Sequence, residues 1–144
     1  MGMTAADIEA FLAREFPEAQ TPKVLSADGQ HATLSLDYRS SQLRPGGTLS
    51  GPTMMALADT AMYVLVLSAI GEVALAVTTN LSINFLRRPK AEALVAKASM
   101  LKLGRSLAVG EVSLHAASDP TPCAHAVVTY ALPPGTPLKA NTSL

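Results

Sequence analysis

Asp59 is the residue with the clearest chemical potential, because it is the only charged residue in the otherwise mostly apolar stretch 51–70. A carboxylate in such a setting costs free energy unless it is paired, neutral or open to a cleft. An apolar environment also makes a carboxylate a base that can act near neutral pH. The alternative is a structural role, in which Asp59 only accepts hydrogen bonds from Thr60, Tyr63 or a neighbouring chain.

Gly51 is the second candidate, because it stands with Pro52 at the expected start of a helix. The first N–H groups of a helix are unpaired and lie at the positive end of its dipole, so such an amide can hold a developing oxyanion. A glycine before a proline also marks ordinary helix starts. Eight residues of helix place Gly51 and Asp59 about 12 Å apart, too far to touch one reacting carbonyl. Two antiparallel helices across a dimer interface would bring Gly51 of one chain beside Asp59 of the other.

The elements predicted around this helix indicate an α+β fold. Helical spacing predicts a short amphipathic helix over 4–16, and the apolar stretch predicts a long helix over 52–70. Alternating apolar and polar residues predict two strands before the long helix and four after it, with residues 39–51 as a loop. The predicted strands span residues 23–27, 30–38, 72–86, 93–103, 106–117 and 122–132. An antiparallel sheet that curls around the long helix would bury it.

Composition narrows the class of protein. The 144 residues are 49% apolar and carry a formal net charge of zero with 4% aromatics, which argues against a nucleic-acid partner. A single cysteine, Cys123, excludes an intrachain disulfide and a cysteine-based metal site. The first 16 residues lack a secretory signal, and the strands after residue 70 favour a buried core helix over a membrane span. We therefore expect a cytoplasmic protein with no membrane partner, with one domain over 1–132 and a flexible tail over 133–144.

Five segments carry a resemblance to a known family. The sequence has GGTLSGP at 46–52, LADTA at 57–61, AVTTN at 76–80, INFLRRP at 83–89 and GRS at 104–106. In this order and spacing it resembles the PaaI-like acyl-CoA thioesterases, and the resemblance extends from about Arg44 to Tyr130. It implies the hotdog fold, in which a curled antiparallel sheet wraps one long helix. It also implies side-by-side pairing of two sheets into a homodimer, and pairing of such dimers into a homotetramer.

The resemblance also implies a mechanism. The Gly51 amide would polarise the thioester carbonyl, and Asp59 of the facing subunit would act as nucleophile or general base. Thr78 or Thr79 stands where relatives often have a hydroxyl that helps place the water, and the sequence does not choose between them. The alternative for either threonine is an ordinary strand residue. The acyl-CoA is the substrate, and no cofactor or metal is implied.

Binding of coenzyme A would require a basic rim for its phosphates. The residues that we expect to bind substrate or coenzyme A are Arg44, Ser50, Pro52, Tyr63, Arg87, Arg88, Lys90, Gly104, Arg105 and Ser106. The alternative for each charged residue is a solubilising role at a sheet edge or turn. Tyr63 and the methionines at 54, 55 and 62 are candidates for the acyl pocket, with core packing as the alternative for the methionines.

The sequence departs from the family pattern at three positions. Ser50 stands at the motif histidine's position, Pro52 at that of the second glycine, and Arg44 at one that is asparagine in many relatives. Loss of the histidine leaves open a non-catalytic protein that binds or senses acyl-CoA. A hotdog hydratase is disfavoured, because Val64 stands where those enzymes place a histidine five residues after the aspartate. The three histidines, at 31, 115 and 125, form no recognisable triad with a serine and a carboxylate.

Overall fold

The structure is a computed structural model that describes residues 2–17, 20–39, 43–44, 48–73 and 75–134. It contains two helices, α1 (Ala5–Glu15) and α2 (Gly51–Ile70). Its strands are β1 (Lys23–Ala27), β2 (His31–Leu36), β3 (Leu43–Arg44), β4 (Thr48–Leu49), β5 (Val77–Phe85), β6 (Leu94–Leu103), β7 (Leu107–Ala116) and β8 (Ala124–Ala131).

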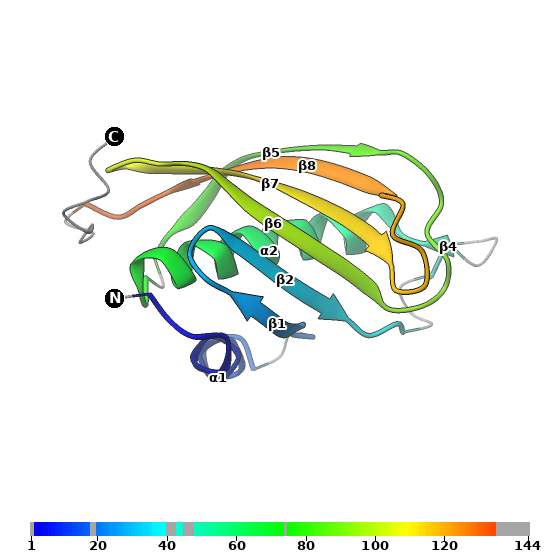
Figure 1. The fold of residues 1–144 in the computed structure, drawn as a ribbon, viewed down its shortest axis with the longest axis horizontal. Coiled ribbons are helices and arrows are strands. Elements are labelled where there is room, and N and C mark those ends of the chain that lie inside the picture. The colour runs from blue at the N-terminus through cyan, green and yellow to red at the C-terminus, as the bar shows by residue number, and fades with distance from the viewer. Residues whose placement is uncertain (1, 18–19, 40–42, 45–47, 74, 135–144) are drawn as a thin grey trace.

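Six strands form one antiparallel sheet in the order β1-β2-β6-β7-β8-β5. The sheet curls along α2, and α1 lies beside the β1 edge (Figure 1). The crossover from β2 through α2 to β5 puts the strand that follows the helix at the opposite edge from β1. One side of α2 therefore faces the sheet and is covered by it, and the strand that follows α2 along the chain, β5, lies at an edge of the sheet.

The helix α2 supplies the centre of the core. Its second half is buried on every side, from Ala61 to Ile70. By length and composition α2 could cross a membrane, but 72% of its apolar window is buried inside the fold. An all-round apolar helix is what the centre of a curled sheet requires. Its first half is different, because Pro52, Met55 and Ala56 are exposed.

The predicted α+β architecture is confirmed, and so are the positions of the main elements. Thr4 caps α1 through a capping box with Asp7, as expected for a threonine at this position. Two details differ. Residues 39–51 were predicted to be a loop, but they contain the short paired strands β3 and β4. The strand predicted over 72–86 begins only at Val77, because a turn with a bond from the Ala76 N–H to the Val73 carbonyl precedes it. The predicted tail lies mostly outside the described residues.

Gly110 sets how closely the sheet approaches α2. It lies in β7 on the face that packs against the helix, and a Cβ there would lie 2.6 Å from the Met62 sulfur and 2.9 Å from the Ser99 carbonyl oxygen. Ser99 belongs to β6 and pairs with the neighbouring Glu111, so its backbone cannot move away cheaply. The close packing of sheet on helix therefore depends on glycine at this position.

We expect Gly110→Ala to lower the free energy of unfolding by about 1–3 kcal/mol, the usual cost of overpacking a filled core. Urea unfolding followed by circular dichroism measures it. Ser113→Ala, on the outward face of the same strand, is the control and should change stability by less than about 0.5 kcal/mol. Equal stability of wild type and Gly110→Ala would show that the sheet can move away from α2.

Candidate functional site

Asp59 lies in the first half of α2, half-buried, and its carboxylate is met by two hydroxyl donors. The Thr78 hydroxyl donates to Asp59 Oδ1 over 2.5 Å, and the Tyr130 hydroxyl lies 3.0 Å from the same oxygen. Tyr130 also lies 3.2 Å from the backbone oxygen of Asp59. These donors differ from the Thr60 and Tyr63 that the sequence suggested, and they come from two strands of the sheet. The carboxylate is thus paired where the apolar helix alone would leave it without donors.

Thr78 and Tyr130 are neighbours across the β5–β8 ladder. They oppose each other in register, so both side chains emerge on the same face of the sheet, toward α2. A register shift follows between Thr78 and Asn80, and the Thr79 hydroxyl bonds the Thr129 carbonyl over 3.4 Å. Of the two threonines, the structure therefore brings Thr78 to the carboxylate and turns Thr79 to its own sheet.

An aromatic cluster backs the two donors. The ring of Tyr130 stacks on that of Tyr63 with centroids 5.8 Å apart and planes at 18°. Tyr63 in turn contacts Phe11 and Phe16 of the N-terminal segment, each at 6.3 Å between centroids. Burial raises the pKa of Tyr130, and the negative charge of Asp59 adds to the increase against a lowering effect of the Thr78 hydrogen bond. Burial also raises the pKa of Tyr63, with smaller contributions from Glu15 and Glu72. Tyr130 is therefore held as a protonated donor.

A cavity of about 200 Å³ opens beside the carboxylate. Its lining comes from α1, the segment after it, α2 and β8, and comprises Leu12, Phe16, Gln20, Thr21, Pro22, Asp59, Thr60, Tyr63 and Tyr130. A second hollow of about 430 Å³ shares three of these residues and continues along α2 past Pro52. Tyr63, a candidate for the acyl pocket, lines the smaller cavity. Met54 and Met62 are core residues with at most 4% exposure, and Met55 is exposed, so none of the three lines the described cavities.

The start of α2 is built as expected. Ser50 is the N-cap, its hydroxyl accepts from the Thr53 N–H over 3.3 Å, and Pro52 stands in the first turn. The Met54 N–H donates to the Ser50 carbonyl, and proline has no N–H. Among the described residues, this leaves the Gly51 amide as the first-turn donor open to a ligand. The ring of Phe85, at the far end of β5, lies 3.4 Å from where a Cβ of Gly51 would stand.

The two expected catalytic groups therefore lie at opposite ends of β5. Asp59 meets Thr78 near the beginning of the strand, and Gly51 meets Phe85 at its end. Along α2, eight residues separate Gly51 from Asp59, which is about 12 Å. One chain by itself does not bring the Gly51 amide to the Asp59 carboxylate.

The predicted basic residues also divide between these ends. Arg87, Arg88 and Lys90 are exposed after β5, and the Arg87 side chain is fixed by a bond from Nε to the Pro122 carbonyl. Gly104, Arg105 and Ser106 form the β6–β7 connection, which closes beside the other end of β5, where Leu107 and Val77 both pair with Ala131. Arg44 lies in β3 opposite Thr48. No single cluster in one chain contains both basic groups.

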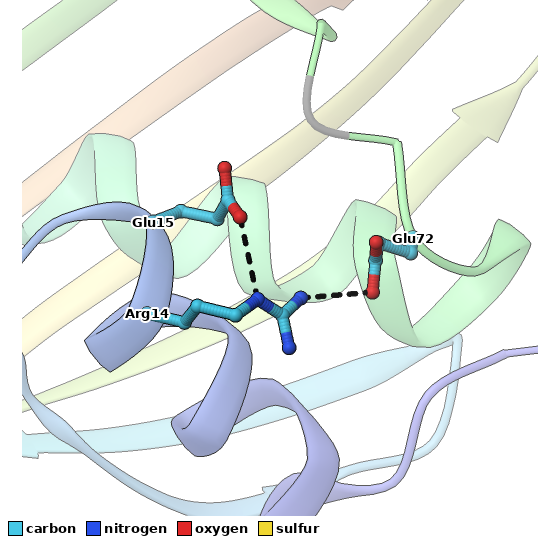
Figure 2. Close-up of polar contacts among 3 residues, drawn as sticks. All are labelled: Arg14, Glu15 and Glu72. Atoms are coloured by element: carbon cyan, nitrogen blue, oxygen red, sulfur yellow. Dashed lines mark hydrogen bonds and ion pairs between the residues drawn. The ribbon is translucent and has the colours of Figure 1, made fainter.

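An ion pair holds α1 over the aromatic cluster. Figure 2 shows Arg14 between Glu15 and Glu72, with Nη2 of Arg14 3.2 Å from Oε1 of Glu72. The Arg14 guanidinium also lies 5.3 Å from the centroid of the Phe11 ring. Glu72 follows the end of α2, so the contact joins the end of α1 to the end of the core helix. Exposed pairs of this kind add little stability, and the buried side chains of α1 supply most of its docking.

The remaining candidate groups lie away from this site. His125 contacts Glu111 at 2.9 Å, in a cross-strand pair of β8 and β7, and His115 Nδ1 lies 2.8 Å from the Ala116 oxygen. Cys123 is buried just before β8, and burial raises the pKa of its thiol. Over the part of the chain that the structure describes, no three His, Cys, Asp or Glu side chains gather closely enough to hold a metal ion.

Tyr130 is the site residue that sequence reasoning missed. It stands 71 positions after Asp59, and no local motif marks it. The only sequence signal was the alternation in the strand predicted over 122–132, which points position 130 toward the helix.

Comparison with known proteins relates the chain to one superfamily. The family model described as Thioesterase superfamily matches residues 46–123. A predicted thioesterase from Silicibacter sp. TM1040 has 42% sequence identity and a TM-score of 0.83, over 90% of this chain and 92% of that one. The PaaI protein from the phenylacetic acid degradation operon of E. coli has 23% identity and a TM-score of 0.74, over 88% and 92%. Thioesterase HI1161 from Haemophilus influenzae has 16% identity and a TM-score of 0.80, over 92% of both chains.

The last two likenesses concern the fold alone, and with the architecture above they confirm the predicted hotdog fold. A search of curated proteins found no match.

The buried donor to Asp59 predicts sensitivity to alkali. The pKa of Tyr130 is raised above the ordinary tyrosine value of 10.0, so its contribution to stability is complete below that pH and is lost as the pH rises further. Tyr130→Phe should therefore reduce the loss of unfolding free energy above pH 10 by up to about 1.4 kcal/mol per pH unit. Urea unfolding from pH 8 to 11 measures the slope. Tyr38→Phe, at an exposed tyrosine, is the control; equal slopes in all three proteins would contradict the assignment.

Proposed function

Because the chain belongs to the thioesterase superfamily, we propose that it hydrolyses an acyl- or aryl-CoA thioester to a free acid and coenzyme A. The observation that carries this proposal is the Asp59 carboxylate, which is held by the Thr78 hydroxyl and lines a mostly apolar cavity. A fixed carboxylate beside an apolar cavity is suited to act on water next to a bound acyl group.

In the proposed reaction, Asp59 acts as a general base. The water oxygen bonds to the thioester carbonyl carbon while a water proton passes to the Asp59 carboxylate. The carbon–sulfur bond then breaks, and the proton passes to the leaving sulfur, which gives the acid and the free thiol and restores the carboxylate. The Thr78 hydroxyl donates to Asp59 and keeps lone pairs that can accept from the water. The Gly51 amide stabilises the charge on the carbonyl oxygen.

The Gly51 amide and the Asp59 carboxylate act together only in a dimer. The strand β5 is at an edge of the sheet, and seven of its nine residues are exposed, Val77 and Phe85 among them. An exposed edge with apolar side chains is a template for pairing with a second strand. Antiparallel pairing of two β5 strands puts the Phe85 end of one chain beside the Thr78 end of its partner. Gly51 lies at the first end and Asp59 at the second, so each two-fold related site receives both.

The same two-fold axis would also pair the α2 helices of the two chains. If Gly51 of one α2 opposes Asp59 of the other, Met55 lies on the axis, midway between them. Met55 is 41% exposed and its neighbours Pro52 and Ala56 are exposed, so this face of α2 is apolar and open in the single chain. Pairing would bury it. The dimer therefore joins both the sheets and the helices.

The basic residues support the same arrangement. The pairing brings the end of one β5, which carries Arg87, Arg88 and Lys90, beside the partner end that carries the connection Gly104–Ser106. Two separated basic groups thus become one rim, which suits the phosphates of coenzyme A. Asp119 and Glu92 lie close enough to Lys90 to interact with it electrostatically, so Arg88 is the freer of the exposed cations for a phosphate.

The cavity favours a compact acyl group. Its volume of about 200 Å³ is below the roughly 300–1,000 Å³ that ordinary ligand pockets enclose, and aromatic rings line it. Short acyl groups or a single aromatic ring fit this cavity, whereas a long chain would also have to occupy the second hollow of about 430 Å³, which shares three lining residues with it. The hydratase reading is disfavoured further, because Val64, at the position of the required histidine, is fully buried.

We expect thiol release from a panel of short, medium, long and aryl acyl-CoAs, with the fastest turnover among the short and aryl members. Asp59→Asn should lower turnover by about 10²–10⁴-fold while the fold persists, since it removes the general base. Thr78→Val should lower it as well, whereas the matched Thr79→Val should retain most of it. Unchanged turnover in Asp59→Asn would refute the mechanism. Tight acyl-CoA binding measured by calorimetry, with no turnover, would favour the alternative of a non-catalytic binding protein, which the replacement of the motif histidine by Ser50 left open.

The two-chain site predicts complementation between inactive variants. Gly51→Pro removes the amide at the first helical position, and Ser50 already has the extended ψ of 153° that precedes proline. Residue 51 itself precedes Pro52 in helical conformation, which is disfavoured for a residue with a Cβ, so circular dichroism first checks that the variant keeps the fold. Refolding an equal mixture of Gly51→Pro and Asp59→Asn should restore about a quarter of wild-type activity, because half of the dimers are hybrids with one intact site. Refolding each variant alone is the control. A mixture as inactive as its parents would show that each site lies within one chain.

A further inference from the structure

The two oxygens of the Asp59 carboxylate stand in different environments. Oδ1 accepts from the Thr78 hydroxyl at 2.5 Å and from the Tyr130 hydroxyl at 3.0 Å. The structure gives Oδ2 no donor among the described side chains. A carboxylate oxygen that accepts two hydrogen bonds has little capacity left for a third, so the free lone pairs lie on the other oxygen.

Tyr130 is the rigid member of the pair of donors. Its side chain is 4% exposed, whereas Thr78 is exposed on the edge strand. Its ring is fixed by the stack on Tyr63, which stands one helical turn after Asp59 on α2. The position is further set by the register of β8 against β5 on one side and β7 on the other. A donor held from three directions fixes the rotamer of the carboxylate that it bonds.

We propose that Tyr130 is a positioning residue, which anchors Asp59 through Oδ1 and thereby makes Oδ2 the oxygen that receives the proton from water. This inference rests on the proposed thioesterase function and adds a residue and an atom to it. Tyr130 itself touches neither substrate nor water in this role. Its hydroxyl acts through Asp59, and its high pKa keeps the proton on the hydroxyl throughout the reaction.

The anchored oxygen explains how the base is kept ready. The two donors hold Oδ1, so Oδ2 remains available to water. The proton that Oδ2 takes from water is returned to the leaving sulfur, and Oδ1 keeps its two hydrogen bonds through both steps. Tyr63 and Asp59 on α2, Tyr130 on β8, and Glu15 and Glu72 near Tyr63 are the titratable groups around this contact. Thr78, the donor from β5, carries no charge in either state.

The test compares Tyr130→Phe with wild type, Asp59→Asn and the matched control Tyr38→Phe. The phenylalanine keeps the ring and its stack and removes only the hydroxyl. We expect kcat to fall about 10- to 100-fold, the cost of a poorly aligned catalytic group, with KM little changed. Tyr38→Phe should keep the wild-type values.

The outcomes separate this inference from the proposed function. Turnover that depends on Asp59 but is unchanged in kcat by Tyr130→Phe would overturn the positioning role. A raised KM with unchanged kcat would also overturn it, since that marks a contact with substrate. Absence of turnover in wild type would refute the proposed function instead. In that case the carboxyl-carbon NMR resonance of Asp59, assigned by its loss in Asp59→Asn, still tests the anchor. Its chemical shift at one fixed pH should change in Tyr130→Phe and stay the same in Tyr38→Phe, and an unchanged shift in Tyr130→Phe would contradict the bond.

Discussion

A carboxylate on an apolar core helix imposes the main constraint on this fold. The helix α2 fills the curled sheet, and Asp59 is its one charged side chain. Without donors such a group would lose its hydration at a cost of several kcal/mol. The sheet meets this demand with two residues, Thr78 and Tyr130, that oppose each other in one ladder. Both donors come from strands that pack on α2, and the ring of Tyr63 backs Tyr130.

The same region is the part of the fold that one chain leaves uncovered. The strand β7 alternates between buried and half-exposed residues, as a central strand with one face on the core should. The strand β5 does not, because most of its residues are exposed on both faces. An edge strand of nine residues with Val77 and Phe85 exposed would favour aggregation in a monomer. A second copy of the chain would cover this edge and the open face of α2 in one step, so assembly and completion of the site would be a single event.

The sequence predicted the architecture because two periodicities dominate it. An all-round apolar run marked α2, and alternating runs marked the long strands. It could not choose between Thr78 and Thr79, because the register shift between Thr78 and Asn80 interrupts the alternation. The shift puts Thr78 on the same face as Leu81 and Ile83, which pack on the core. Composition does not show where a strand contains one extra residue. Such a shift turns every later side chain of the strand to the opposite face of the sheet.

The contact of Tyr130 with Asp59 could not be predicted from the sequence for a different reason. Its partner is 71 residues away, and the contact exists only because β8 lies between β7 and β5. Strand order is decided by how the crossover from α2 returns to the sheet, which no local pattern encodes. The methionines illustrate the same limit, because helical spacing gives a face of α2 but not how far the sheet wraps around it. Met54 and Met62 are therefore core, although they flank the residues that line the cavity.

The replacement of the family's motif histidine by Ser50 is less disruptive than the sequence suggests. Serine is among the best N-cap residues, and here its hydroxyl accepts from the Thr53 N–H and lies 2.8 Å from the Thr53 hydroxyl. The start of α2 is thus fixed by a local cap, and the backbone at Gly51 keeps its place at the positive end of the helix. The departure therefore changes the side chain at this end of α2, and it leaves the Gly51 amide and the Asp59 carboxylate where the fold positions them.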